Sequence, residues 1–487
     1  HPSFFHCRCP FQTLLISFLA ESSLVMASVP YCYLTSPNAA SPLTAVGRCR
    51  IPAAASSNGS YAQVLQHAQE LVQALQELDE TKRKTAKKKA TKSAQAAAIQ
   101  FLQQDCALDV SIVDVEIVVP AADLIATQGH VATALLDGGG ERIVVMAENP
   151  DENEDWLEAL AAMHLPLNRV TVHFRNQVPD PSVLAQAATF CDAVSLDYTA
   201  ADANIDDLLN SVKTLPHSLS INCQVAATMD PTHVAQICQA RSPEAGKLIR
   251  AILTDPTAEQ LGMAFAACCR TDRPDGLYTT VVCTRQGEAL GLVYSSKESI
   301  VAALEAGRGV YYSRSRHGLW RKGDTSGHYQ VLHRIDVDCD ADALRFLVTQ
   351  QGEPHPAFCH LHSLTCWGGH SLRGLRHLQD TIADRIQNAP AGSYTKKLLD
   401  NPDLLRNKLV EEAQELAEAE SKQHVAEELA DVLYFALTRS VQAGVSLDDA
   451  VCELDRRTRK VTRRPGLAKD FRIAAGEAIL EQKKEES

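Results

Sequence analysis

The sequence predicts a multidomain protein of the α/β plus all-α class, and three observations support this. Residues 108–269 alternate apolar strand-like segments with helical ones, which is typical of an α/β domain with a mainly parallel sheet. Residues 270–370 combine short strand-like runs with Asp and Cys residues, which predicts a small β-rich α+β domain that binds metal. Residues 371–470 show helical apolar periodicity, which predicts a helical bundle.

The first 107 residues are expected to be a leader and linker, largely disordered, with one amphipathic helix at 60–80. No acidic residue occurs from 22 to 69, a composition that permits an organelle transit peptide; a disordered leader after a start at Met26 is the alternative. The apolar run at 14–20 is too short to span a membrane. Seven of the eleven residues at 82–92 are basic, which predicts a solvated linker.

The α/β domain at 108–269 is expected to contain a series of buried strands. They are predicted at 111–119, 142–147, 170–174, 193–198 and 218–223. Helical stretches such as 155–163 and 181–191 separate them. The three glycines at 138–140 indicate a turn, because no phosphate-loop pattern follows them. The function of this domain does not follow from the sequence, and a degenerate barrel and an assembly module are both compatible with it.

Residues 336–342 alternate acids with a thiol. The candidate metal-binding acids in it are Asp338, Asp340 and Asp342, and the thiols available for a second site are Cys339, Cys359 and Cys366. On a strand the three aspartates would share one face, suited to Mg²⁺, and Cys339 would point to the other. Three thiols would leave a zinc ion a fourth position for water, whose pKa zinc lowers toward about 7. A solvated strand edge and ordinary buried cysteines are the alternatives.

A basic, hydroxyl-rich stretch directly upstream predicts a cradle for an anion. Its candidate residues are Ser313, Arg314, Arg316, Arg321, Lys322, Thr325 and Ser326. Arginine binds phosphate with a two-pronged fork, and small residues let the backbone approach it. A solvated basic loop is the alternative, but it would not require Gly323 and Gly327 around the Thr-Ser pair. His360, beside Cys359, is a candidate proton carrier or a structural residue.

Two acidic segments with helical periodicity follow. The candidate carboxylates are Glu411, Glu412, Glu415, Glu428 and Asp431. If residues 421–424 turn the chain, the two helices pack antiparallel and bring four or five carboxylates together, a cluster that requires divalent cations. The solvated face of a bundle is the alternative. Candidate phosphate-binding residues are Lys396, Lys397, Lys408, Arg463 and Arg464.

These motifs resemble two consecutive enzymes of histidine biosynthesis. Residues 271–368 resemble the phosphoribosyl-AMP cyclohydrolase family, and 375–469 resemble the phosphoribosyl-ATP pyrophosphohydrolases, through Glu-Glu-x-x-Glu followed by Glu-x-x-Asp. The resemblance implies zinc at the three cysteines, across a dimer interface, and magnesium at the three aspartates and the helical carboxylates. It also implies that phosphoribosyl-ATP loses pyrophosphate and that the adenine ring of phosphoribosyl-AMP is then opened at N1–C6.

The resemblance further implies a homodimer formed through the cyclohydrolase and helical domains. Eukaryotic multifunctional histidine proteins often continue into a histidinol dehydrogenase domain, but only a charged tail at 471–487 follows here, so two activities are expected and NAD is not. A nucleotide house-cleaning pyrophosphohydrolase with an inactive cyclohydrolase half and a metal-stabilised assembly protein are the competing functions.

Composition excludes some partners and suggests a compartment. The formal charge of −13 argues against a general nucleic-acid binder, which needs wide basic surfaces. No membrane partner is expected. Fifteen cysteines without a regular framework suggest a reducing compartment. A cytoplasmic location is therefore expected, with an organelle or plastid as the alternative.

Overall fold

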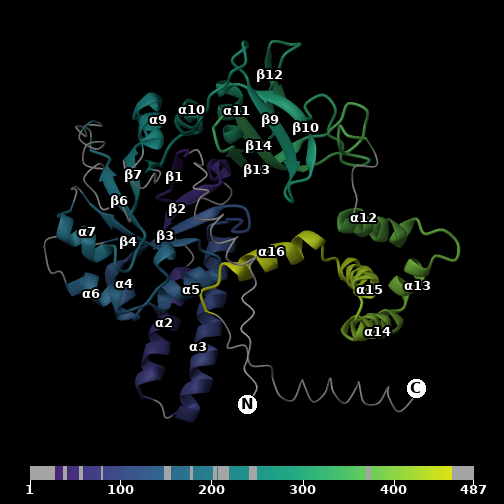
Figure 1. The fold of residues 1–487 in the computed structure, drawn as a ribbon, viewed down its shortest axis with the longest axis horizontal. Coiled ribbons are helices and arrows are strands. Elements are labelled where there is room, and N and C mark those ends of the chain that lie inside the picture. Colours follow the sequence, from purple (N-terminus) through teal and green to yellow (C-terminus); the bar gives the residue numbers. More distant parts are fainter. Residues whose placement is uncertain are drawn as a thin grey trace, which may run out of the picture.

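The N-terminal domain is a closed barrel of eight parallel strands in the computed structural model (Figure 1). The structure describes residues 28–36, 41–53, 59–77, 80–146, 155–175, 179–200, 206, 219–240, 249–368 and 374–462. The strands are β1 (Tyr31–Tyr33), β2 (Arg48–Pro52), β3 (Asp114–Pro120), β4 (Arg142–Met146), β5 (Val170–Phe174), β6 (Ala193–Tyr198), β7 (Ser220–Ala226) and β8 (Ile249–Thr254). Because β1 pairs with both β2 and β8, the sheet has no free edge.

Helices cover the outside of the barrel. They are η1 (Pro42–Val46), α2 (Ser60–Glu77), α3 (Glu80–Gln100), η3 (Phe101–Asp105), α4 (Ala121–Ala126), α5 (His130–Gly138), α6 (Asp155–Ala161), η4 (Leu167–Arg169), α7 (Pro181–Ala187), α9 (Pro231–Gln239) and α10 (Ala258–Cys268). The five expected strands and the amphipathic helix at 60–80 are confirmed. The domain is a closed barrel, which was one of the two possibilities left open, and an assembly role is compatible with this fold.

The expectation that the chain is largely disordered up to residue 107 is wrong for the described residues. Strands β1 and β2 belong to the barrel, and the basic run at 82–92 lies within α3 instead of a linker. Alanines such as Ala90, Ala94 and Ala98 are buried along one side of α3, which packs on α2 and α5. The lysines therefore occupy the rest of a docked helix, an arrangement that composition alone does not reveal.

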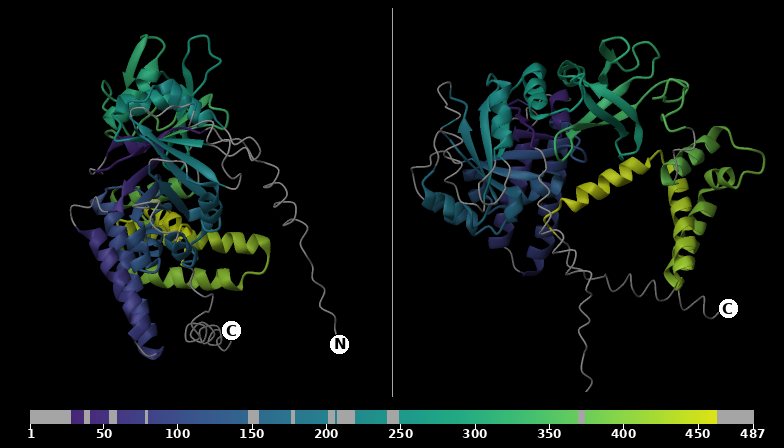
Figure 2. Two further views of the ribbon diagram at one scale, coloured as in Figure 1. Left: turned by 90° about the vertical axis from the view of Figure 1, so that its left-hand side faces the viewer. Right: turned by 45° about the horizontal axis from the view of Figure 1, so that its top comes forward.

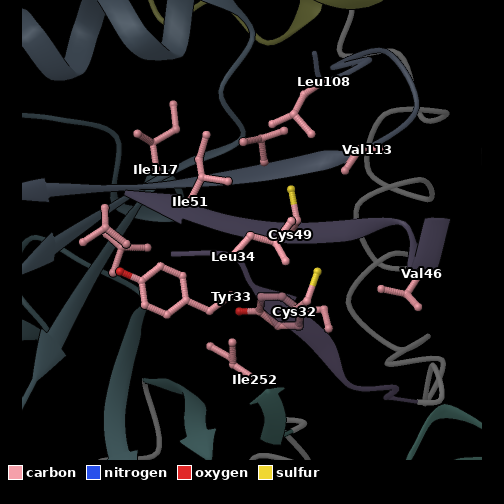
Figure 3. Close-up of a cluster of buried hydrophobic side chains, with 14 of the residues drawn as sticks. Cys32, Tyr33, Leu34, Val46, Cys49, Ile51, Leu108, Val113, Ile117 and Ile252 are labelled. Atoms are coloured by element: carbon pink, nitrogen blue, oxygen red, sulfur yellow. The ribbon is translucent and has the colours of Figure 1, made fainter. Parts of the chain in front are cut away.

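Apolar side chains of the first three strands point outward, into the layer between strands and helices. Figure 3 shows Cys32, Cys49, Ile51 and Ile117 in this cluster, with Leu108 packed against them. Burial raises the pKa of the Cys32 thiol to about 12. These cysteines are therefore small apolar core residues that stay protonated.

The interior of the barrel holds a buried ionic network where such barrels usually pack branched apolar residues. Arg50 and Glu116 are each 1% exposed, and Arg50 Nη2 lies 2.8 Å from Glu116 Oε2. The Tyr31 hydroxyl donates to the same oxygen at 2.9 Å, and Arg50 Nη1 donates to Ser195 Oγ at 2.9 Å. Burial alone would raise the pKa of Glu116, but Arg50 and Arg48 outweigh it and lower that pKa to about 2. The network therefore stays ionised.

The second domain is a four-stranded sheet of order β10-β9-β14-β13 with a two-stranded hairpin beside it. The elements are β9 (Tyr278–Thr284), β10 (Ala289–Ser295), α11 (Lys297–Ala306), β11 (Val310–Ser313), β12 (Gly318–Arg321), β13 (Gln330–Val337) and β14 (Ala343–Gln350). Strand β14 runs parallel to β9, while β9–β10 and β13–β14 pair antiparallel. This confirms the small β-rich α+β domain.

The third domain is entirely helical in the described residues. It contains α12 (Gly374–Gln387), α13 (Tyr394–Asp400), α14 (Pro402–Glu418), α15 (Lys422–Gln442) and α16 (Leu447–Thr458). Its buried core is small, with Leu398, Leu405 and Phe435 at the centre. Within the part of the chain that the structure describes, no helix combines the length and apolar character needed to cross a membrane.

Candidate metal centres

Three aspartates gather at a turn of the second domain. Strand β13 ends at Val337 and β14 begins at Ala343, so residues 338–342 form a tight turn and the expected strand is wrong. The carboxylates of Asp338, Asp340 and Asp342 nevertheless each offer an oxygen within 4.8 Å of the others. Asp338 Oδ1 accepts the backbone N–H groups of Asp342 and Ala343 at 3.0 and 3.1 Å. The first aspartate therefore folds the turn that gathers all three.

The charges of this turn favour a hard cation. The nearby Asp340 carboxylate, more than any other cause, raises the pKa of Asp342. Arg270 Nη2 lies 3.0 Å from Asp340 and balances part of the negative charge. Because divalent cations with oxygen ligands relieve such repulsion, the turn is suited to Mg²⁺.

Cys359 and Cys366 approach each other in the segment that follows β14. The Cys366 N–H donates to Leu290 O of β10 at 2.8 Å, which places this thiol over Gly291. A Cβ atom at Gly291 would overlap the Phe358 ring and lie 2.9 Å from Cys366 Sγ. The backbone N–H of Leu361 lowers the pKa of the Cys359 thiol, whereas burial raises that of Cys366.

Cys339 does not join these two thiols within one chain. It is exposed in the aspartate turn, and in the described part of the chain it forms no three-ligand group with Cys359 and Cys366. A single copy therefore presents two of the three expected thiols together. His360 lies beside the pair, with Nδ1 3.8 Å from Cys359 Sγ.

The predicted anion cradle divides between two environments. Ser313 ends β11, and Arg314 and Arg316 follow in the turn to β12; Arg314 lies 4.1 Å from the centre of the Tyr294 ring. Arg321 ends β12, and Thr325 and Ser326 lie exposed in the turn beyond it. Lys322 differs, because it is 6% exposed and its Nζ lies 5.2 Å from the centre of the Phe358 ring, near the thiol pair.

Sequence reasoning missed several residues around these groups. Arg273 stacks on the Tyr294 ring at 4.4 Å, like Arg314. His328 is 6% exposed and lies edge-on to His362, with the ring centres 5.9 Å apart. Their burial and ring contacts arise from tertiary packing, which the spacing of residues in the sequence does not reveal.

Helices α14 and α15 form an antiparallel hairpin that brings three carboxylates together. Glu412, Glu428 and Asp431 each offer an oxygen within 4.8 Å of the others. The chain reverses at residues 419–421, because Ser421 already caps α15. Four or five carboxylates were expected, but Glu411 and Glu415 lie outside this three-ligand group. Glu411 is exposed and pairs with Lys408 at 2.9 Å, because adjacent helical positions point about 100° apart.

The contacts of Glu412 and Glu428 with neighbouring residues show that this cluster can bind a cation. Glu412 is 7% exposed and lies 3.1 Å from Lys408 Nζ. Glu428 Oε1 lies 3.2 Å from His424 Nε2, while its buried Oε2 has no hydrogen-bond partner among the described residues. A buried carboxylate oxygen without a donor is costly, and a bound cation would remove that cost.

The predicted phosphate-binding residues of the helical domain are only partly described. Lys396 Nζ pairs with Asp400 at 2.9 Å on the surface of α13, and Lys397 lies on the same helix. Hydrogen bonds to Glu411 and Glu412 raise the pKa of Lys408. Arg463 and Arg464 lie outside the described residues.

A cavity of about 540 Å³ lies between the second and third domains. Its walls include His355, which precedes both thiols in the sequence, His362, which lies between them, and Arg376 from α12. Arg376 pairs with Glu288 of the second domain at 3.2 Å and with Asp448 of α16 at 2.6 Å. Arg376 therefore connects the second domain to the third.

The barrel, the second domain with its aspartate turn and its thiol pair, and the acidic helical hairpin define a multidomain protein with candidate metal centres in two separate domains. The model of the phosphoribosyl-AMP cyclohydrolase family matches residues 291–368 of this chain. The model of the phosphoribosyl-ATP pyrophosphohydrolase family matches residues 375–458. Histidine biosynthesis bifunctional protein HisIE of Pyrococcus furiosus is 34% identical over 199 residues, which cover 38% of this chain and 93% of that protein. The chain belongs to the family of bifunctional histidine biosynthesis proteins that join these two domains.

Longer fungal proteins are also similar. Histidine biosynthesis bifunctional protein his7 of Schizosaccharomyces pombe is 52% identical over 215 residues, covering 44% of this chain and 50% of that protein. A histidine biosynthesis trifunctional protein of Kluyveromyces lactis is 51% identical over 200 residues, covering 41% of this chain and 25% of that protein. The chain thus spans half or less of the length of these two relatives.

Proposed function

We propose that this chain is a bifunctional hydrolase of L-histidine biosynthesis. It would convert phosphoribosyl-ATP to phosphoribosyl-AMP and pyrophosphate, and then open the adenine ring at N1–C6. The observation that carries the proposal is that each of the two family domains contains its own assembled carboxylate group. Since the product of the first reaction is the substrate of the second, the two domains form a consecutive pair.

Pyrophosphate release is assigned to the helical hairpin. Glu412, Glu428 and Asp431 fit Mg²⁺, because their oxygens converge and no described residue donates a hydrogen bond to Glu428 Oε2. Bound Mg²⁺ supplies charge neutralisation for the triphosphate and orientation for the attacking water. Lys408 holds Glu412 in place, and His424 holds the other oxygen of Glu428.

Further residues of this domain would support the same reaction. Glu411 and Glu415 would contribute from the rim, and Lys396, Arg463 and Arg464 would bind the phosphates. Their assignment rests on their positions in the sequence motif.

Ring opening is assigned to the second domain. Cys359 and Cys366 fit two positions of a zinc site, and Cys339 from a second copy of the chain would supply the third thiol in a homodimer, which the helical domains would also help to form. Zinc bound there supplies a strongly acidified water. His360 would carry the proton at Nδ1, which lies beside Cys359. Asp338, Asp340 and Asp342 would hold Mg²⁺ at the turn between β13 and β14.

The substrate's phosphates would be bound by the two turns of the cradle. The proposed residues are Ser313, Arg314, Arg316, Arg321, Lys322, Thr325 and Ser326. The exposed arginines can present their forks to phosphate, whereas buried Lys322 faces the thiol end of the site. We place both reactions in the cytoplasm, since all thirteen cysteines of the described residues are free thiols.

Separate assays of the two substrates test this assignment. Protein stripped of metal by a chelator should lose both activities. Added Mg²⁺ alone should restore pyrophosphate release from phosphoribosyl-ATP, while conversion of supplied phosphoribosyl-AMP should also need Zn²⁺. Turnover of ordinary nucleoside triphosphates in place of phosphoribosyl-ATP would point to the house-cleaning alternative. If intact, metal-loaded oligomers turned over neither phosphoribosyl nucleotide, the result would favour the metal-stabilised assembly protein.

A further inference from the structure

The barrel has no assigned role. The HisIE relative is covered over 93% of its length by matches in the C-terminal part of this chain. The two catalytic domains therefore occur together without a barrel of this size. The role of the barrel must be sought in what its surface contacts.

A buried aspartate of the barrel binds the chain where it leaves α16. Asp137, near the end of α5, is 2% exposed. Its Oδ1 accepts the backbone N–H groups of Val461 and Thr462 at 2.9 and 3.1 Å, and the Thr462 hydroxyl donates to its Oδ2. One carboxylate thus receives three donors from the end of the helical domain. Hydrogen bonds to an ionised acceptor are roughly twice as strong as neutral ones.

Arg459, the residue that follows the end of α16, reinforces the same contact. Its Nη2 lies 3.1 Å from Asp114 and its Nε 3.6 Å from Glu141, both on the barrel. In the other direction, Arg169 Nη1 of the barrel donates to Arg459 O at 2.8 Å. Carboxylates of the barrel thus contact the Arg459 guanidinium of the helical domain, and the Arg169 guanidinium of the barrel contacts a backbone carbonyl of that domain. The two surfaces are therefore complementary in charge.

The adjoining part of the barrel also holds the second domain. Arg285 Nη2, from the β9–β10 turn, lies 2.5 Å from Asp109 and 3.6 Å from Cys452 Sγ of α16. Arg334 Nη1 of β13 donates to Ile112 O at 2.6 Å. Figures 1 and 2 show α16 extending from the helical hairpin to the barrel, close to where the second domain meets it. Residues 109–114 and 137–141 thus form one docking surface with two occupants.

We propose that the barrel is a docking platform that fixes the pyrophosphohydrolase domain relative to the cyclohydrolase domain, through Asp137 and Arg459. This role depends on neither activity. It also assigns Val461 and Thr462, directly before the candidate phosphate-binding residues Arg463 and Arg464, to holding the barrel and not the substrate.

Amide hydrogen exchange of the full chain tests the platform. In Asp137→Ala, exchange at Val461 and Thr462 should become faster by on the order of tenfold or more, since two bonds to a carboxylate are lost. Asp123→Ala removes a comparable acceptor, bonded to the Tyr61 hydroxyl at 2.7 Å elsewhere on the barrel, and should leave these amides protected. Wild-type protection of both amides in folded Asp137→Ala would overturn the proposal.

Solution scattering tests the same contact through a substitution in the helical domain instead of the barrel. Arg459→Met leaves the barrel sequence intact, so it covers the case in which Asp137→Ala does not fold. Combined with Arg285→Met, it should increase the radius of gyration as the helical domain leaves the platform. An unchanged radius of gyration with unchanged amide protection would overturn the platform even if both hydrolytic activities were present.

Discussion

Replacement of Glu116 by Gln should destabilise the barrel by about 3 kcal/mol. The fold lowers the pKa of Glu116 from 4.5 to about 2. Since each factor of ten in an acid constant is worth roughly 1.4 kcal/mol, this shift corresponds to about 3 kcal/mol of stabilisation of the charged form. Removing one partner of a buried ion pair typically costs about 3–5 kcal/mol, because the other charge is left uncompensated. Arg50 would be that charge, at 1% exposure.

Hydrogen exchange of the β2 and β3 amides measures this loss for the barrel alone. Tyr31→Phe is the matched control: it removes one hydrogen bond to Glu116, keeps the ion pair, and should cost about 1 kcal/mol. A loss below about 1 kcal/mol in Glu116→Gln would refute the account of the network.

The same network gives the barrel a defined response to acid. Because the pKa of Glu116 is lowered in the fold, its contribution is complete above about pH 4.5 and is lost as the pH falls toward about 2. Burial lowers the pKa of His173 to about 3, so protons favour the unfolded chain below about pH 6.5 as well. Strand-amide protection should therefore fall steadily with acid, and in Glu116→Gln it should fall less steeply. Equal slopes in both proteins would contradict this.

Three substitutions probe the two catalytic domains. Cys359→Ala should abolish ring opening and lower zinc content while pyrophosphate release continues; loss of both activities in a folded protein would contradict separate sites. Glu412→Gln should reduce pyrophosphate release by on the order of a hundredfold or more and spare conversion of supplied phosphoribosyl-AMP. Gly291→Ala should impair ring opening alone, because its Cβ would displace Phe358 and Cys366; normal ring opening would show that the thiol segment adapts.

Much of the architecture is encoded in local patterns, whereas the closure of the barrel depends on contacts between distant parts of the chain. Apolar runs predicted β3 to β7, and periodicity predicted the helical domain. The sequence left a barrel open as one possibility only, because β1 has three residues and is separated from β3 by β2, α2 and the basic helix α3. Closure depends on pairing of β1 with β8, more than two hundred residues away, and no sequence window contains both.

The candidate metal sites were also predicted only in part from the sequence. The aspartates were predicted to converge on a strand, and they converge at a turn instead, because Asp338 bonds to the backbone that follows it. The spacing of Glu412, Glu428 and Asp431 was sufficient for the hairpin cluster, since two packed helices obey a fixed repeat. Burial of Lys322 and stacking on Tyr294 depend on tertiary packing and left no signal in the sequence.

The most direct test of two working sites in one chain is a single reaction with phosphoribosyl-ATP, Mg²⁺ and Zn²⁺, in which pyrophosphate and the ring-opened nucleotide are followed together. The account predicts that both products appear and that phosphoribosyl-AMP remains a transient intermediate. Pyrophosphate with a lasting accumulation of phosphoribosyl-AMP, in protein that retains its zinc, would contradict it.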